Sequence, residues 1–129
     1  MKVMVMVKAT ELSETGAPPS GATQSAMERF NGELVKAGVL LAAEGLQPSI
    51  KGKRVQFKGA ERHIVDGPFA ETKELVAGFW LWQVKSMEEA VEWLKRCPNP
   101  GPGEWVIEAR PVFEMADFCD AATASPQAT

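Results

Sequence analysis

The run Val76–Val84 constrains the fold more than any other part of this sequence. Successive side chains of a strand point to opposite faces, so three large side chains share one face: Trp80, Trp82 and Val84. Phe79 and Leu81 lie on the other face, where Gln83 is the polar exception. Both faces are therefore apolar, and each needs a cover that excludes water. The run Lys2–Lys8, apolar within and charged at both ends, predicts a second central strand.

Two amphipathic helices are predicted to cover this sheet. Ser25 opens a capping box with a glutamate three residues later, and apolar residues follow at helical spacing: Met27, Phe30 and Leu34. Gly38 stands where a left-handed C-cap belongs, and residues 9–22 are expected to form a mobile loop. Ser86 opens a second capping box, before a stripe made of Met87, Ala90, Val91 and Leu94. The proline after Cys97 ends this helix.

A hairpin and a final strand complete the predicted order. Arg54–Lys58 alternates polar and apolar residues, and a glycine-containing turn leads into Arg62–Val65, which predicts a hairpin with one wet face. Trp105–Val112 is the last predicted strand. The order β-α-β-(hairpin)-β-α-β is that of an α+β, ferredoxin-like sandwich with an antiparallel sheet. We assign residues 1–115 to one domain and residues 116–129 to a flexible C-terminal tail.

This architecture places both helices on one face of the sheet and leaves the other face open. Exposed apolar surface costs about 25 cal/mol per Å², so an open face of large apolar side chains is unstable in water. We therefore predict a homodimer in which two open faces enclose a shared interior. The face that carries Trp82 is a candidate for this shared surface.

Composition narrows the classes of function. The chain has 129 residues and a net charge of -3 without a basic run, which disfavours direct binding of nucleic acid. Two cysteines, Cys97 and Cys119, are too few and too far apart for a disulfide scaffold or a zinc site. Neither a membrane span nor a signal peptide is recognisable, so we expect a cytoplasmic protein without membrane contact. Nothing in the sequence requires a cofactor.

Asp66 is the sharpest candidate for chemistry. It begins an Asp-Gly-Pro turn that sets a polar cluster between two strands. Asp66 could cap this turn through the backbone N–H groups that follow it, because Asp-Gly turns are common for local reasons. Alternatively, its carboxylate could lie at the mouth of an apolar pocket and act as a general base. The sequence leaves both interpretations open.

His63 is the sole histidine, so any imidazole chemistry depends on it. Its separation of three residues from Asp66 would place the two side chains on opposite faces of a strand, which favours an exposed hairpin histidine. No ligand spacing indicates a metal site.

Further candidates surround the turn. Burial of Phe69 would draw the charged segment onto the sheet, where Thr72 and Lys73 could bind an anionic or carbonyl oxygen. Glu71 or Glu74 could then pair with Lys73, although a solvated loop is the usual fate of such a charge run. Three more side chains could face the same cavity or serve only the core and the surface: Glu44, Trp80 and Arg110.

The string Asp66–Glu74 resembles the signature of the YCII-related, DGPF-domain proteins. The resemblance continues through Met1–Met6, Ala37–Leu40, Glu44–Pro48, Gly78–Leu81, Glu89–Trp93, Cys97-Pro98 and Ile107–Val112. It implies a dimeric α+β barrel built on ferredoxin-like subunits. Some relatives are suspected enzymes with a His-Asp pair, whose Asp maps onto Asp66, while His63 lies on the adjoining strand rather than near the first helix. Others are encoded beside or fused to extracytoplasmic-function sigma factors, which implies a sigma factor as a partner.

Two functional hypotheses follow. In the first, the protein is a lyase or isomerase in which Asp66 acts as acid or base on a small molecule, and Thr72 or Lys73 stabilises the developing oxyanion. In the second, it is a non-catalytic module that senses a small ligand or contacts a sigma factor. A third interpretation gives the signature loop a purely structural role in a stable dimer.

Overall fold

The computed structural model describes residues 1–99 and 101–118. Its centre is a four-stranded antiparallel sheet with the order β2-β5-β1-β6. These strands are β1 (Lys2–Lys8), β2 (Leu40–Gly45), β5 (Val76–Gln83) and β6 (Ile107–Pro111). The predicted α+β class, the antiparallel sheet and the two central strands are confirmed. Most of the predicted tail, residues 119–129 with Cys119, lies outside the described residues.

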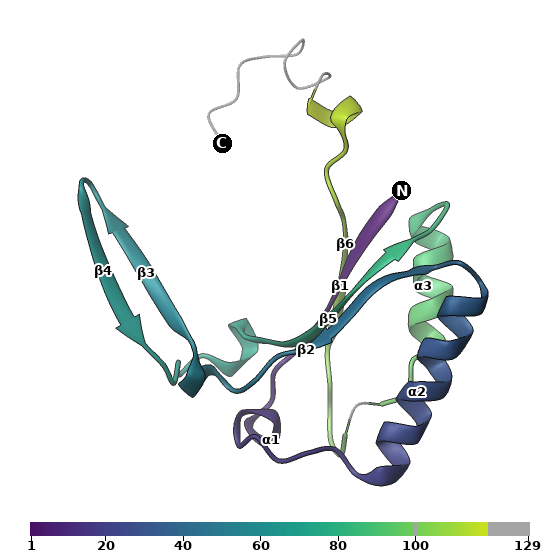
Figure 1. Cartoon of the computed structure of the whole chain (residues 1–129), viewed down its shortest axis with the longest axis horizontal. Coiled ribbons are helices and arrows are strands. Elements are labelled where there is room, and N and C mark those ends of the chain that lie inside the picture. Colours follow the sequence, from purple (N-terminus) through teal and green to yellow (C-terminus); the bar gives the residue numbers. More distant parts are fainter. Residues whose placement is uncertain (100, 119–129) are drawn as a thin grey trace.

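The helices α2 (Gly21–Lys36) and α3 (Met87–Arg96) lie on the same side of the sheet (Figure 1). Ser86 caps α3 as predicted, because its hydroxyl accepts a hydrogen bond from the backbone N–H of Glu89 at 3.1 Å. Gly38 follows α2 with φ +73°, which confirms the predicted left-handed position.

The start of α2 and the loop before it differ from the prediction. The N-cap is Ser20, whose hydroxyl accepts from the N–H of Thr23 at 3.2 Å, and Ser25 lies inside the helix. The capping-box spacing at Ser25 was therefore misleading. Ser20, directly after a pair of prolines, is an N-cap residue five positions earlier, and the helix begins there. The segment predicted as a mobile loop also contains a short helix, α1 (Glu11–Glu14), closed by reciprocal hydrogen bonds between Thr10 and Ser13.

The core lies between the helices and one face of the sheet. Trp80 and Trp82 of β5 are 6% and 0% exposed, and the ring of Phe30 on α2 meets Trp80 edge to face at 5.8 Å. The alternation along β5 is therefore as predicted, but Trp82 belongs to the core of its own subunit. The suggestion that its face pairs with a second copy is wrong, because α2 and α3 cover that face.

The other face of the sheet carries Phe79 and Leu81. The strand register aligns the side chains of this face in two rows across the sheet, which are Ala42-Leu81-Met4-Arg110 and Glu44-Phe79-Met6-Glu108. Each row is apolar at its centre on β1 and β5 and charged at one or both ends. On the β6 edge, Glu108 pairs with Lys8 at 3.5 Å and with Arg110 at 3.8 Å. Within residues 1–99 and 101–118, no helix covers these rows (Figure 1).

The predicted hairpin forms a separate two-stranded sheet of β3 (Lys53–Lys58) and β4 (Glu61–Asp66). It extends away from the main sheet, on the side opposite to α2 and α3 (Figure 1). Its register places an apolar group on one face, made of Val55, Phe57 and Ile64. All residues of both strands are exposed, and an isolated two-stranded hairpin is marginally stable at best. The hairpin therefore also lacks a cover among the described residues of its own chain.

The revised start of α2 can be tested with two serine substitutions. Ser20→Ala should lower the free energy of unfolding by about 1 kcal/mol, because the N–H of Thr23 loses its acceptor. Ser25→Ala should leave it unchanged or raise it by a few tenths, since alanine is the better residue within a helix. Urea unfolding followed by tryptophan fluorescence measures both. A larger loss for Ser25→Ala than for Ser20→Ala would contradict the observed cap.

Candidate functional site

Asp66 ends β4 with an exposed carboxylate. Its side chain is 70% exposed and contacts the Nζ of Lys53 at 2.6 Å. The N–H groups that follow it bond elsewhere, that of Gly67 to the carbonyl of Gly52 at 3.0 Å and that of Phe69 to the hydroxyl of Ser49 at 3.0 Å. Asp66 therefore does not cap the turn. In the isolated subunit it forms a solvated ion pair, which contributes little to stability.

The turn is held by residues far away in the sequence. The carboxylate of Glu14 on α1 accepts hydrogen bonds from both the backbone N–H and the hydroxyl of Ser49, at the start of the single-turn helix η1 (Ser49–Lys51). The same hydroxyl accepts from the N–H of Phe69. The backbone of Gly67 lies so close to η1 that a Cβ there would be 1.8 Å from the carbonyl oxygen of Ser49. The Asp-Gly-Pro turn thus anchors the base of the hairpin to α1 and η1.

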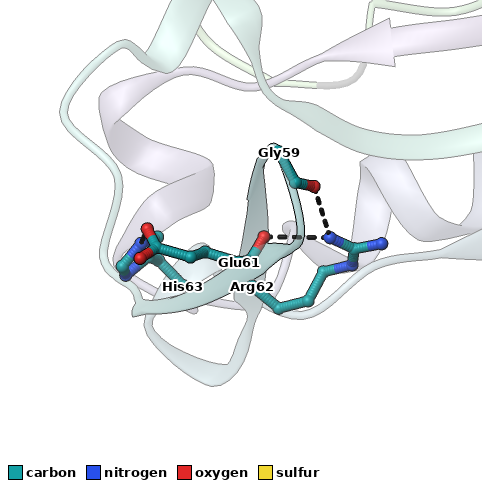
Figure 2. A network of polar contacts seen from close by, with 4 residues as sticks. All are labelled: Gly59, Glu61, Arg62 and His63. Atoms are coloured by element: carbon teal, nitrogen blue, oxygen red, sulfur yellow. Dashed lines mark hydrogen bonds and ion pairs between the residues drawn. The ribbon is translucent and has the colours of Figure 1, made fainter.

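His63 lies on the opposite face of the hairpin from Asp66, as the register of β3 and β4 shows. Its Nε2 is 3.0 Å from a carboxylate oxygen of Glu61. Figure 2 shows His63 beside Glu61, with Arg62 on the other side of the strand, where it donates to the carbonyls of Gly59 and Glu61 at 3.1 and 3.0 Å. The predicted placement of His63 away from Asp66 is confirmed, and one subunit contains no His63-Asp66 dyad.

The other predicted residues are distributed over several places. Glu71, Thr72 and Lys73 lie at the short helix η2 (Thr72–Glu74), and Lys73 makes no ion pair with either neighbouring glutamate. Phe69 lies beneath the guanidinium of Arg54, 3.9 Å from the ring centre, and lines a pocket of about 770 Å³. Arg110 occupies an end of the open sheet face.

Two of the predicted residues, Trp80 and Glu44, are among those that line the other pocket. This pocket, of about 690 Å³, lies between α1, the loop that follows it, the first turns of α2, and β2 and β5. Its walls are mostly apolar and include Leu12, Pro18, Pro19, Met27, Trp80 and Trp105. A volume of this size suits a small organic ligand. Asp66 and His63 are not among its lining residues.

Asn31 supplies a polar group to the wall of this pocket, which we call the α2 pocket. Its Oδ1 accepts a hydrogen bond from the indole Nε1 of Trp80 at 2.8 Å. No sequence pattern predicted this pair, because Asn31 and Trp80 are 49 residues apart and meet only when α2 packs on β5. Glu44 borders the α2 pocket as well, but its partner in the strand register is Phe79, so its side chain lies on the open face of the sheet.

The described part of the chain offers little support for cysteine chemistry, a metal site or a membrane-spanning helix. Burial raises the pKa of the Cys97 thiol from 9.0 to about 11, so this cysteine stays protonated and unreactive at neutral pH. No three His, Cys, Asp or Glu side chains converge as metal ligands within residues 1–99 and 101–118. Over the same residues, no helix has the length and apolar character needed to cross a membrane.

The close approach at Gly67 makes a specific prediction. Gly67→Ala should lower the free energy of unfolding by about 1–3 kcal/mol, because the new Cβ would collide with the backbone of Ser49. Gly32→Ala is the matched control: no atom outside the helix approaches its Cβ position, and alanine within α2 should raise stability by about 0.5–1 kcal/mol. Thermal or urea unfolding compares the two, and an equal response would refute the role of Gly67 in anchoring the hairpin.

Comparison with known proteins agrees with the signature at this turn. The family model of the YCII-related domain matches residues 1–116. An uncharacterised protein of Rhizobium meliloti is 34% identical over 88 residues, which are 68% of this chain and 68% of the relative. The family match covers the two central strands, both main helices and the anchored hairpin. This chain belongs to the YCII-related family.

Proposed function

We propose that this protein binds a small molecule in the α2 pocket and acts as a homodimer. The observation that carries the binding function is the pocket itself, an apolar space of about 690 Å³ with a few polar groups on its wall. Small-molecule sites in proteins have this size and this mixture of groups.

Two uncovered apolar surfaces support the homodimer. One is the centre of the open sheet face, formed by Met4, Met6, Phe79 and Leu81. The other is the apolar face of the hairpin, where Phe57 is 69% exposed. Both lie on the side of the subunit opposite to the helices, so a second copy could cover both at once by a two-fold arrangement. Pairing of the open faces would produce the dimeric α+β barrel expected for this family.

A lyase or isomerase reaction would need an acid or base beside the ligand. Glu44 borders the α2 pocket, but its side chain lies on the open face of the sheet, and Asp66 lies on the hairpin outside the pocket. Asp66, with Thr72 or Lys73 as an oxyanion partner, could serve in catalysis if dimerisation brings the hairpin to a ligand. A ligand-sensing module that contacts a sigma factor would use the same pocket. Measurement of turnover distinguishes the two hypotheses, because an enzyme converts the bound molecule and a sensing module releases it unchanged.

Ligand binding in the α2 pocket can be tested with a pair of substitutions. Small aromatic molecules are titrated into ¹⁵N-labelled protein, and the indole N–H resonance of Trp80 reports contact with the pocket. Ala43→Leu should weaken binding, because the larger side chain fills space beside Trp80. Ala22→Leu makes the same change on an exposed part of α2 outside the pocket and should bind normally. Shifts confined to the hairpin would argue against this site.

The dimer can be tested separately from the ligand. Leu81→Glu places a charge at the centre of the open face and should convert the dimer into a monomer, because a buried unpaired carboxylate is strongly unfavourable. Val35→Glu adds the same charge at a 61% exposed position on α2 and should leave the assembly intact. Sedimentation velocity measures both masses. A wild-type monomer, or an unaltered mass for Leu81→Glu, would count against pairing through this face.

A further inference from the structure

The orientation of the Asn31 side-chain amide in the wall of the α2 pocket follows from its hydrogen bond with Trp80. The indole N–H of Trp80 can only donate, so the Asn31 atom at 2.8 Å from it must be the amide oxygen. The amide nitrogen of Asn31 is therefore on the other branch of the side chain. None of the described residues accepts a hydrogen bond from this NH₂ group, although Asn31 lines the pocket. The wall thus offers two N–H donors that a ligand oxygen could use.

The electrostatics of the pocket restrict the charge of the ligand. No lysine, arginine or histidine is among the described residues that line it. The side chain of Glu44 lies on the open face of the sheet, opposite to Trp80. An anionic ligand would lose hydration in an apolar space without gaining a counter-charge. Carboxylates, phosphates and nucleotides are therefore disfavoured.

The shape and composition of the walls favour an apolar body. Leu12, Pro19 and Met27 face the pocket from α1, the following loop and α2, and Trp80 and Trp105 supply aromatic surface. Burial of a ring or short hydrocarbon chain among these side chains would provide most of the binding free energy, since that term scales with the apolar area removed from water. One polar group would then fix the orientation of the ligand.

From these three observations we infer that the α2 pocket selects neutral carbonyl compounds, with an apolar ring or chain and an oxygen that accepts a hydrogen bond from the Asn31 amide. This inference rests on the proposed function and names its ligand class. Asn31 becomes the residue that recognises the oxygen, and Trp80 the residue that orients Asn31. Anions are disfavoured because no basic side chain is among the described residues that line the pocket.

Three probes of similar size separate these contributions: acetophenone is a neutral ketone, cumene replaces its carbonyl by an apolar branch, and benzoate replaces it by an anion. Each is titrated into the full-length protein, and the indole resonance of Trp80 is followed. Acetophenone should bind about tenfold more tightly than cumene, the difference that corresponds to one hydrogen bond. Benzoate should bind more weakly than either.

Asn31→Asp is the decisive variant. It keeps an oxygen for the indole of Trp80 but removes the NH₂ donors, so the subunit should fold normally and retain the Trp80 hydrogen bond. Its affinity for acetophenone should fall about tenfold, while cumene should bind as it does to the wild type.

The outcomes distinguish the inference from the proposed function. Equal affinity for acetophenone and cumene, or the tightest binding for benzoate, would overturn the selection of carbonyl compounds while leaving a small-molecule site in place. An unchanged acetophenone affinity in Asn31→Asp would overturn the role of Asn31. If no probe shifts the Trp80 resonance at any concentration, both the inference and the proposed binding function fail.

Discussion

The alternation of side chains along β5 is the constraint on which this structure depends. Trp80 and Trp82 point to the helices, and Phe79 and Leu81 point away from them. Helices α2 and α3 cover only this one face, because α2 connects β1 to β2 and α3 connects β5 to β6 on the same side of the sheet. The covered face becomes the core, with Trp82 at 0% exposure, and opens at one end into the α2 pocket. On the other face, the described residues leave the apolar rows uncovered.

The short helix α1 connects the α2 pocket to the base of the hairpin. Leu12 and Ser13 of α1 line the α2 pocket, and the next residue, Glu14, holds Ser49 with two hydrogen bonds. The hydroxyl of Ser49 in turn accepts a hydrogen bond from the N–H of Phe69, and the backbone of Ser49 lies against Gly67. The wall of the pocket and the base of the hairpin are therefore parts of one hydrogen-bonded unit. The signature turn is needed physically for this close packing, whatever role its exposed carboxylate has in a dimer.

Local patterns in the sequence predicted local features well. The periodicity of β1 and β5, the Ser86 cap and the hairpin were all recognisable, and the odd spacing of His63 and Asp66 correctly placed them on opposite faces. The cap of α2 was missed because two serines lay at suitable positions and only Ser20 follows the turn of the chain. Alternation alone could not decide whether the helices cover the Trp82 face or the Leu81 face, and the choice made for Trp82 was wrong.

Hydrogen-bonded pairs between residues far apart in the chain could not be predicted from the sequence, for a different reason. Asn31 with Trp80 and Glu14 with Ser49 are 49 and 35 residues apart, and no periodicity links such positions. Each pair arises only when separate elements pack, so the α2 pocket could not be assembled from motifs. The sequence instead directed attention to Asp66, which is exposed in the single subunit. Its predicted catalytic role depends on what a second copy places beside it.

The central claim is that β5 separates a ligand-binding face from a partner-binding face. Isotope-filtered NOE spectra test it directly, with a sample that mixes chains carrying ¹³C-labelled methionine and leucine methyl groups with unlabelled chains. We predict intermolecular NOEs to the methyl groups of Met4, Met6 and Leu81, and none to Met27 beside the α2 pocket. Intermolecular NOEs at Met27, or their complete absence at the methyl groups of the open face, would contradict this division.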